Sequence, residues 1–165
     1  MNKSIVFIVT VTVVLFAGIV FLARPGQQGV NQENQVLGQS TLMADMGMFS
    51  FGTISMAEGK VNHEYVVTNQ GSEPVTIGKV YTSCMCTEAL VEKDGKTYGP
   101  YGMAGHGFMS KVGVTLEPGE SMRVKAVFDP AAHGPAGVGM VERVVIIENS
   151  AGSNMELRFD ATVTP

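Results

Sequence analysis

From about residue 48 onwards, apolar and polar residues alternate in short segments that are separated by turn residues. The clearest segment follows the turn signal Glu117-Pro118-Gly119-Glu120. It places apolar side chains on one face and basic side chains on the other: Met122, Val124, Ala126 and Phe128 against Arg123 and Lys125. A period of two residues is that of a half-buried β-strand. Comparable segments cover residues 49–54, 61–69, 75–81, 143–147 and 155–163.

Short strands with turn residues between them are typical of a sandwich of two sheets. Residues 48–165 have room for about seven to nine such strands, which is the count of an immunoglobulin-like domain. No segment of this region has the 3.6-residue period of an amphipathic helix. We therefore predict an all-β, immunoglobulin-like β-sandwich domain over residues 48–165.

The N-terminal residues follow a different pattern. No charged residue lies between Ile5 and Ala23, a segment that Lys3 precedes and Arg24 follows. As a helix it would be roughly 28 Å long, close to the thickness of a bilayer core. A cleaved signal peptide is the alternative, although its apolar region usually has only about 7–15 residues. We predict an uncleaved, single-pass transmembrane helix over residues 1–24, with the N-terminus in the cytoplasm and the remainder outside.

Residues 25–47 are predicted to form a flexible linker, because the segment is rich in Gln, Asn and Gly and its apolar residues follow no period. The whole chain has a net charge of −4, and residues 1–24 contain two of its basic residues and none of its acidic ones. An acidic domain argues against a nucleic-acid partner and against adhesion to an anionic lipid surface. Contact with the membrane is therefore expected through the N-terminal helix alone.

Several short motifs occur in a fixed order along residues 48–163. They are Phe51-Gly52-Thr53-Ile54, His63-x-Tyr65-x-Val67-x-Asn69-x-Gly71, Ser83-Cys84-Met85-Cys86-Thr87 and Pro118-Gly119-Glu120. This order resembles the bacterial immunoglobulin-like family known as domain of unknown function 1573, which is itself similar to the sandwich domains of periplasmic pilus chaperones. The resemblance implies an immunoglobulin-like fold and an extracytoplasmic setting, and it implies no known reaction. The sequence departs from the family by an insertion at residues 96–111 and a long loop at residues 130–139.

Cys84 and Cys86 are the only cysteines of the chain. On an extended strand they would share a face with their Cα atoms about 6.6–6.8 Å apart, at the upper limit for a disulfide. A disulfide within Cys-x-Cys would close a very small ring and would be easily reduced. Three interpretations remain open: buried apolar cysteines, a labile disulfide, and ligands of a soft metal ion.

A glycine-rich segment with Met103, His106 and Met109 at a spacing of three follows the cysteines. Thiolate, imidazole and thioether groups together are the ligands that select Cu(I). We therefore predict a metal site formed by Cys84, Cys86 and these three residues, with Cu(I) as its ion. The alternative is that the segment covers one end of the sandwich with apolar side chains and binds nothing.

Zinc is the weaker candidate, because it needs four donors in a tetrahedron and the spacing fits no standard zinc motif. His133 or an acidic residue could be the fourth donor beside the two cysteines and His106. For His133 itself, which lies in a long loop, we favour a position outside any site. His63 alternates with Tyr65 and is expected to pack on the inner side of a strand.

The chain shows no Ser-His-Asp arrangement and no prominent pair of carboxylates, so we predict that it is not an enzyme and has no identifiable small-molecule substrate. Thiol exchange is the weaker possibility, since no basic residue adjoins the cysteines in sequence. The first hypothesis is a membrane-anchored, extracytoplasmic binding or scaffold domain that binds another envelope protein and a soft metal ion at its Cys-x-Cys motif. The alternative is a Cu(I)-binding or thiol-redox protein that uses Cys84 and Cys86 with the loop 103–109.

Overall fold

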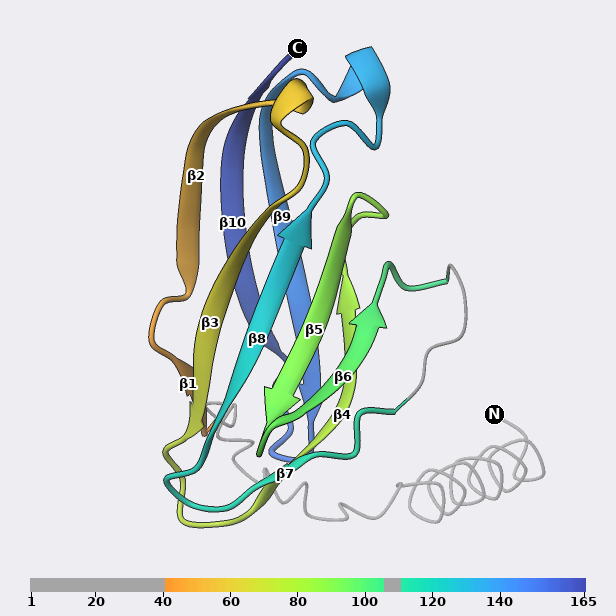
Figure 1. The fold of residues 1–165 in the computed structure, drawn as a ribbon. Coiled ribbons are helices and arrows are strands. Elements are labelled where there is room, and N and C mark those ends of the chain that lie inside the picture. The colour runs from red at the N-terminus through yellow and green to blue at the C-terminus, as the bar shows by residue number, and fades with distance from the viewer. Residues whose placement is uncertain (1–40, 106–110) are drawn as a thin grey trace, which may run out of the picture. The chain divides into compact units, whose positions relative to one another are not determined.

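The computed structural model describes residues 41–105 and 111–165, which form a sandwich of two β-sheets (Figure 1). Ten strands lie within these residues, and the two shortest, β1 and β7, extend the predicted count of seven to nine. The bounds are β1 Leu42–Ala44, β2 Met48–Ser55, β3 Val61–Asn69, β4 Val75–Thr82, β5 Thr87–Lys93, β6 Lys96–Tyr101, β7 Thr115–Leu116, β8 Ser121–Phe128, β9 Gly139–Asn149 and β10 Met155–Thr164, with 3-10 turns η1 Met56–Glu58 and η2 Gly134–Gly137. The predicted all-β fold is confirmed.

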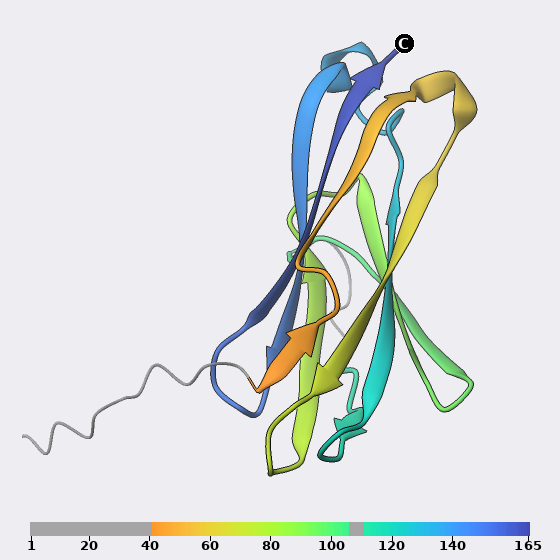
Figure 2. The ribbon, with the colours of Figure 1, turned by 90° about the vertical axis from the view of Figure 1, so that its left-hand side faces the viewer.

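The two sheets have five strands each. The first sheet has the order β1-β3-β8-β5-β6 and the second has the order β2-β10-β9-β4-β7. Strand β2 pairs in parallel with β10, whereas the other paired strands are antiparallel. Figure 2 shows β1 and β2 along the edge of the sandwich that faces the viewer. Because β4 and β5 belong to different sheets, as do β8 and β9, each of these two connections crosses from one sheet to the other.

The apolar face of each strand points into the space between the sheets. In β8 the buried residues are Met122, Val124, Ala126 and Phe128, as the alternation predicts. Strand β10 of the opposite sheet buries Leu157, Phe159, Ala161 and Val163 against the same core. Removal of these side chains from water is the main contribution to the stability of the sandwich.

The β4–β5 and β8–β9 connections lie at the same end of the sandwich. Thr87 at the start of β5 is paired with Phe128 at the end of β8. The next residue, Asp129, donates its backbone N–H to the carbonyl of Cys86 at 2.9 Å. The β4–β5 turn and the β8–β9 loop are therefore neighbours, although about 45 residues separate them in the chain.

Some predictions fall on residues outside the described part of the chain. These are the membrane anchor 1–24, the linker up to residue 40, and the candidate ligands His106 and Met109. Within residues 41–105 and 111–165, no helix is long and apolar enough to cross a membrane. Strand β1 lies inside the segment expected to be linker, and strand β6 occupies the first part of the expected insertion 96–111.

Candidate functional site

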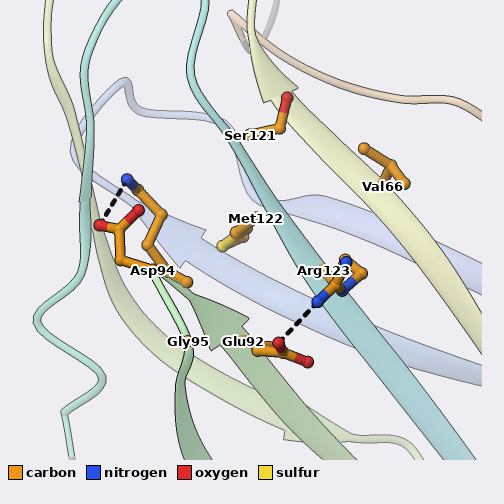
Figure 3. A pocket seen from close by; sticks show the side chains of 8 residues that line it. Val66, Glu92, Asp94, Gly95, Ser121, Met122 and Arg123 are labelled. Atoms are coloured by element: carbon orange, nitrogen blue, oxygen red, sulfur yellow. Dashed lines mark hydrogen bonds and ion pairs between the residues drawn. The ribbon is translucent and has the colours of Figure 1, made fainter.

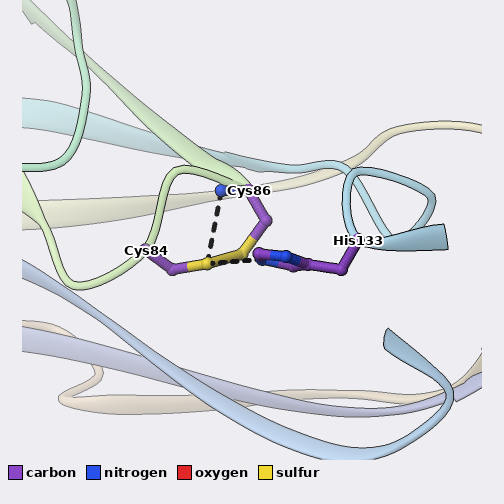
Figure 4. Close-up of side chains that lie close together, drawn as sticks. All are labelled: Cys84, Cys86 and His133. Carbon is purple, nitrogen blue, oxygen red and sulfur yellow. Dashed lines mark hydrogen bonds between the residues drawn. A yellow bond between two sulfur atoms is a disulfide. The ribbon is translucent and has the colours of Figure 1, made fainter. Parts of the chain in front are cut away.

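The Cys-x-Cys motif forms a tight turn between β4 and β5 and is not part of an extended strand. The backbone N–H of Thr87 donates to the carbonyl of Cys84 at 3.1 Å and closes the turn. Thr82 Oγ1 lies 2.9 Å from the carbonyl oxygens of both Cys84 and Thr87. The turn brings the Cα atoms of Cys84 and Cys86 to 5.3 Å, and a disulfide joins the two residues (Figure 4).

Hydrogen bonds fix the turn to the strands on either side. The backbone N–H of Ser83 donates to the carbonyl of Val144 in β9, and Ser83 Oγ accepts from the N–H of Val144, each at 2.9 Å. The carbonyl of Cys86 accepts from Asp129 beyond the end of β8. Because both sheets hold the turn, the position of the two sulfur atoms is set by the fold.

His133 reaches the disulfide from the β8–β9 loop. Asp129 starts that loop with a local turn, in which its carboxylate accepts from the N–H of Ala131 at 2.9 Å. The imidazole points at the disulfide, and its Nε2 lies 3.2 Å from Cys84 Sγ (Figure 4). Gly137 allows this position, because a Cβ atom there would lie 3.2 Å from the Cβ of His133.

Arg143 contacts the other sulfur atom from β9. Its Nε donates to Cys86 Sγ at 3.1 Å, and its Nη1 donates to the carbonyl of Glu142 at 2.8 Å. Along β9, Arg143 is in phase with the buried residues Val145 and Ile147, so its side chain enters the end of the sandwich. Partial burial lowers the pKa of the Arg143 guanidinium, which nevertheless stays charged because arginine is protonated throughout the physiological range.

The two sulfur atoms have different surroundings. Cys86 is 3% exposed and lies beside Arg143 and Thr87, whose Oγ1 is 3.7 Å from its sulfur. Cys84 is half-buried and lies beside the exposed imidazole of His133. An external molecule can therefore approach Cys84 more easily than Cys86.

Two of the five predicted metal ligands belong to this cluster. The sulfur atoms of Cys84 and Cys86 and a ring nitrogen of His133 all lie within 4.8 Å of one another. Met103 is half-buried, and its backbone forms a parallel bridge with Thr82, which places it next to the end of β4. His106 and Met109 lie outside the described residues, so the predicted role of residues 106–109 stays a prediction.

From the sequence alone, His133 is considered only as a possible fourth zinc donor and is expected to lie outside any site, and Arg143 is not predicted beside the cysteines. His133 is 49 residues away from Cys84 in the chain, and only the pairing of β5 with β8 brings the two together. For Arg143 a signal exists in the sequence, because a charged residue stands on the apolar phase of a strand with Val145 and Ile147. His63 is half-buried and stacks on Phe49 at a centroid distance of 3.7 Å, which confirms the prediction that it packs on the inner side of its strand.

A hollow of about 280 Å³ lies elsewhere, on the outer face of the first sheet near the β5–β6 turn (Figure 3). Its charged residues are already paired. Lys93 contacts Asp94 at 2.9 Å and Glu120 at 3.2 Å, and Arg123 contacts Glu92 at 2.6 Å. Since its cations are neutralised by neighbours, we place the candidate site at the Cys–Cys–His cluster.

Residues 42–104 match a family described as protein of unknown function DUF1573. The matched range contains the Cys-x-Cys turn and ends earlier than the range 48–163 over which the motifs of the sequence resemble that family. No curated protein matches the chain.

Several solved structures are similar in fold. A protein of unknown function from Porphyromonas gingivalis W83 is 12% identical with a TM-score of 0.54, and the match covers 73% of this chain and 46% of that protein. This chain therefore spans less than half the length of that relative. The PapD-like domain 7 of human CEP192 is 13% identical with a TM-score of 0.46, and the match covers 76% of this chain and 86% of that domain. At these identities the likeness concerns the sandwich fold alone.

Proposed function

We propose that this chain is a membrane-anchored, extracytoplasmic immunoglobulin-like domain that binds a soft metal ion, Cu(I) foremost, through Cys84, Cys86 and His133. The observation that carries the proposal is the convergence of two sulfur atoms and one imidazole nitrogen within 4.8 Å. Two strand connections that cross between the sheets bring these three side chains together before an ion arrives. Less ordering of the chain is therefore needed when an ion binds to the reduced form.

The donor set favours Cu(I) over the harder cations. Thiolate sulfur selects Cu(I), and imidazole nitrogen is a suitable additional ligand, whereas Mg²⁺, Ca²⁺ and Mn²⁺ prefer oxygen. Structural Zn²⁺ requires a fourth donor to complete its tetrahedron. Met103, next to the end of β4, is a thioether that fits Cu(I) as an additional ligand, and His106 and Met109 remain candidates on the same grounds.

Metal binding requires the reduced form of the cysteines. The disulfide and the metal complex use the same two sulfur atoms, so each state excludes the other. An external dithiol supplies two electrons and two protons, which break the S–S bond and leave two thiols, and the dithiol becomes a disulfide. The two thiols lose their protons when the ion binds.

The proposed setting follows from the apolar N-terminal segment and from the family resemblance. A domain tethered outside the cytoplasm meets the oxidising conditions in which a disulfide persists. Its partner is proposed to be another envelope protein, which receives or delivers the ion and docks through loops or strand edges. No catalytic group beyond the cluster is required for this function, so we propose a non-enzymatic role.

Titration with Cu(I) tests the proposal directly. The full chain in detergent is reduced with a phosphine under anaerobic conditions and titrated in competition with a chromophoric Cu(I) chelator. We expect about one Cu(I) ion per chain for the unmodified protein, since one cluster is present. Cys84→Ser/Cys86→Ser should weaken binding by more than about 100-fold, and His133→Gln by about tenfold or more.

His63→Gln is the matched control, because His63 is a half-buried histidine that packs on Phe49 and does not belong to the cluster. Its Cu(I) affinity should equal that of the unmodified chain. Equal Cu(I) binding by the unmodified chain and by the double cysteine variant would show that the sulfur atoms are not the ligands.

Thiol–disulfide exchange is a second candidate function, and the unequal surroundings of the two sulfur atoms favour it. A thiolate of an external protein would attack the more accessible Cys84 Sγ, the S–S bond would break, and its electron pair would stay on Cys86 Sγ. The Nε–H of Arg143, 3.1 Å from that sulfur, would stabilise the new thiolate. Rapid reduction of the disulfide by a dithiol together with no uptake of Cu(I) would favour exchange over metal binding.

A further inference from the structure

Arg143 differs from the other arginines of the described residues in what it contacts. Arg123 pairs with Glu92 at 2.6 Å, and Arg158 pairs with Glu142 at 2.6 Å. Arg143 donates to Cys86 Sγ and to a backbone carbonyl, and within residues 41–105 and 111–165 no carboxylate pairs with it. A half-buried cation is therefore placed against a sulfur atom that carries no charge while the disulfide is intact.

Reduction of the disulfide changes the charge around Arg143. Cys84 and Cys86 supply one negative charge each as thiolates, and His133 is neutral when it binds a metal ion. Together with the guanidinium, the cluster then carries a single negative charge. A monovalent ion makes the net charge of the cluster zero, whereas a divalent ion leaves the half-buried cluster with one positive charge.

The distance between Arg143 and the bound ion is short enough for the charge of the ion to affect its affinity. Arg143 Nε is 3.1 Å from Cys86 Sγ. An ion bound to that sulfur lies at most one metal–sulfur bond, about 2.3 Å, further from Nε. The repulsion between the ion and Arg143 scales with the charge of the ion, and partial burial weakens the screening by water. The N–H···S hydrogen bond meanwhile holds the sulfur in place, as groups around a metal site commonly do for its ligands.

We infer that Arg143 makes the Cys84–Cys86–His133 cluster selective for a monovalent soft cation over a divalent one. This inference rests on the proposed function, and it adds the residue that determines which ion binds. Arg143 acts through charge and through Cys86, so it is a positioning and selectivity residue, not a metal ligand.

The test compares Cu(I) and Zn²⁺ affinities of the reduced full chain with those of two variants. Arg143→Gln removes the charge and keeps a hydrogen-bond donor, whereas Arg143→Lys keeps the charge. We expect the ratio of Cu(I) to Zn²⁺ affinity to fall at least about tenfold in Arg143→Gln and to be largely retained in Arg143→Lys. Arg158→Gln, which removes an arginine from the outer face of the second sheet, should leave the ratio unchanged.

Three results would overturn the inference in distinguishable ways. If Arg143→Gln lowers both affinities by the same factor, Arg143 has a structural role only. If neither affinity changes, Arg143 does not act on the ion at all. If the unmodified chain binds neither ion, the proposed function fails, and the selectivity role fails with it.

Discussion

At the scale of single residues, Tyr65 is the largest completely buried side chain within residues 41–105 and 111–165. Its hydroxyl donates to the carbonyl of Arg158 at 2.7 Å, which joins β3 of the first sheet to β10 of the second. Burial, with a smaller contribution from the charge of Asp45, raises the pKa of the Tyr65 hydroxyl from 10.0 to about 12. A buried phenolate is costly, so the folded protein holds the proton to a higher pH than the unfolded chain does.

This shift in pKa predicts a loss of stability in alkaline solution. Between pH 10 and about pH 12 the unfolded chain has lost the Tyr65 proton and the folded chain has kept it, so the free energy of unfolding falls as the pH rises. The stability that comes from the raised pKa of Tyr65 is on the order of 2 kcal/mol and is fully present below pH 10. Tyr65→Phe should cost about 1 kcal/mol at neutral pH through the lost hydrogen bond.

Chemical denaturation of both proteins at several pH values checks this prediction. Between pH 10 and pH 12, the free energy of unfolding should fall less steeply with pH for Tyr65→Phe than for the unmodified chain. Parallel declines in that range would mean that another group controls alkaline unfolding.

The sequence predicts the identity of the chemical groups better than their geometry. Cys84 and Cys86 stand out as the only cysteines. The Cys84–Thr87 turn, however, depends on hydrogen bonds that Thr82 and Val144 donate, and the apolar–polar pattern around the cysteines does not reveal these bonds. The strand predicted from the alternation ends at residue 81, and the pattern does not show that the chain crosses between the sheets at residues 83–87. The disulfide, one of the three open interpretations, becomes possible because the turn shortens the Cα–Cα distance to 5.3 Å.

At the scale of elements, the β5–β6 hairpin shows how one glycine fixes the path of a strand. Pairing of Ala89 with Tyr101 and of Val91 with Tyr98 leaves Gly99 and Pro100 opposite a single residue, which is a β-bulge. Gly99 has φ +112°, and a Cβ atom there would lie 2.9 Å from the carbonyl oxygen of Ala89. A larger residue at this position is both strained and in steric conflict with the backbone.

Gly99→Ala is therefore expected to destabilise the domain by about 3 kcal/mol. Gly95→Ala is the matched control, because Gly95 lies in the same hairpin at φ +72° with open space around its Cα, and its cost should be about 1 kcal/mol. Thermal or denaturant unfolding of the two variants measures the difference. Equal costs would mean that the backbone contact at Gly99 relaxes without penalty.

The strands themselves are the part of the fold that the sequence predicts well. Period-two alternation identifies β3, β4, β8 and β10 and residues 143–147 of β9, because in each of these segments one face is buried and the other is not. The segment 96–111 is harder, since its glycines and Pro100 conceal β6. Strand β1 was missed because it has only three residues, too few for a period to be visible.

At the scale of the whole molecule, long-range pairing creates the candidate site. Cys84 and Cys86 come from the β4–β5 turn, His133 from the β8–β9 loop, and Arg143 from β9. No spacing rule joins these residues, because their proximity depends on which strands lie in which sheet and in what register. Without that information, the sequence favours donors close to the cysteines along the chain, such as those of residues 103–109.

The end of the sandwich opposite the site is held together by Asn69. Its Nδ2 donates to the carbonyls of Glu73 at 2.8 Å and Leu116 at 2.9 Å, and its Oδ1 accepts from the N–H of Gly71 at 3.0 Å. The bond to Leu116 joins β3 of the first sheet to β7 of the second. Asn149 forms the same local pattern with Ser153 and Ala151.

These two asparagines allow the link between the sheets to be separated from the local turn. Asn69 is completely buried, so Asn69→Ala leaves buried backbone groups without partners and should cost about 3 kcal/mol. Asn149 is half-buried, so Asn149→Ala should cost only about 1 kcal/mol. Denaturant midpoints at an unchanged slope measure both losses.

Because Asn69 lies at the Thr68–Ser121 end of the first sheet and the cluster lies at its Thr87–Phe128 end, Cu(I) affinity should be the same in both variants as in the unmodified chain. A weaker affinity in Asn69→Ala under conditions where it is fully folded would show that the two ends of the sandwich are coupled.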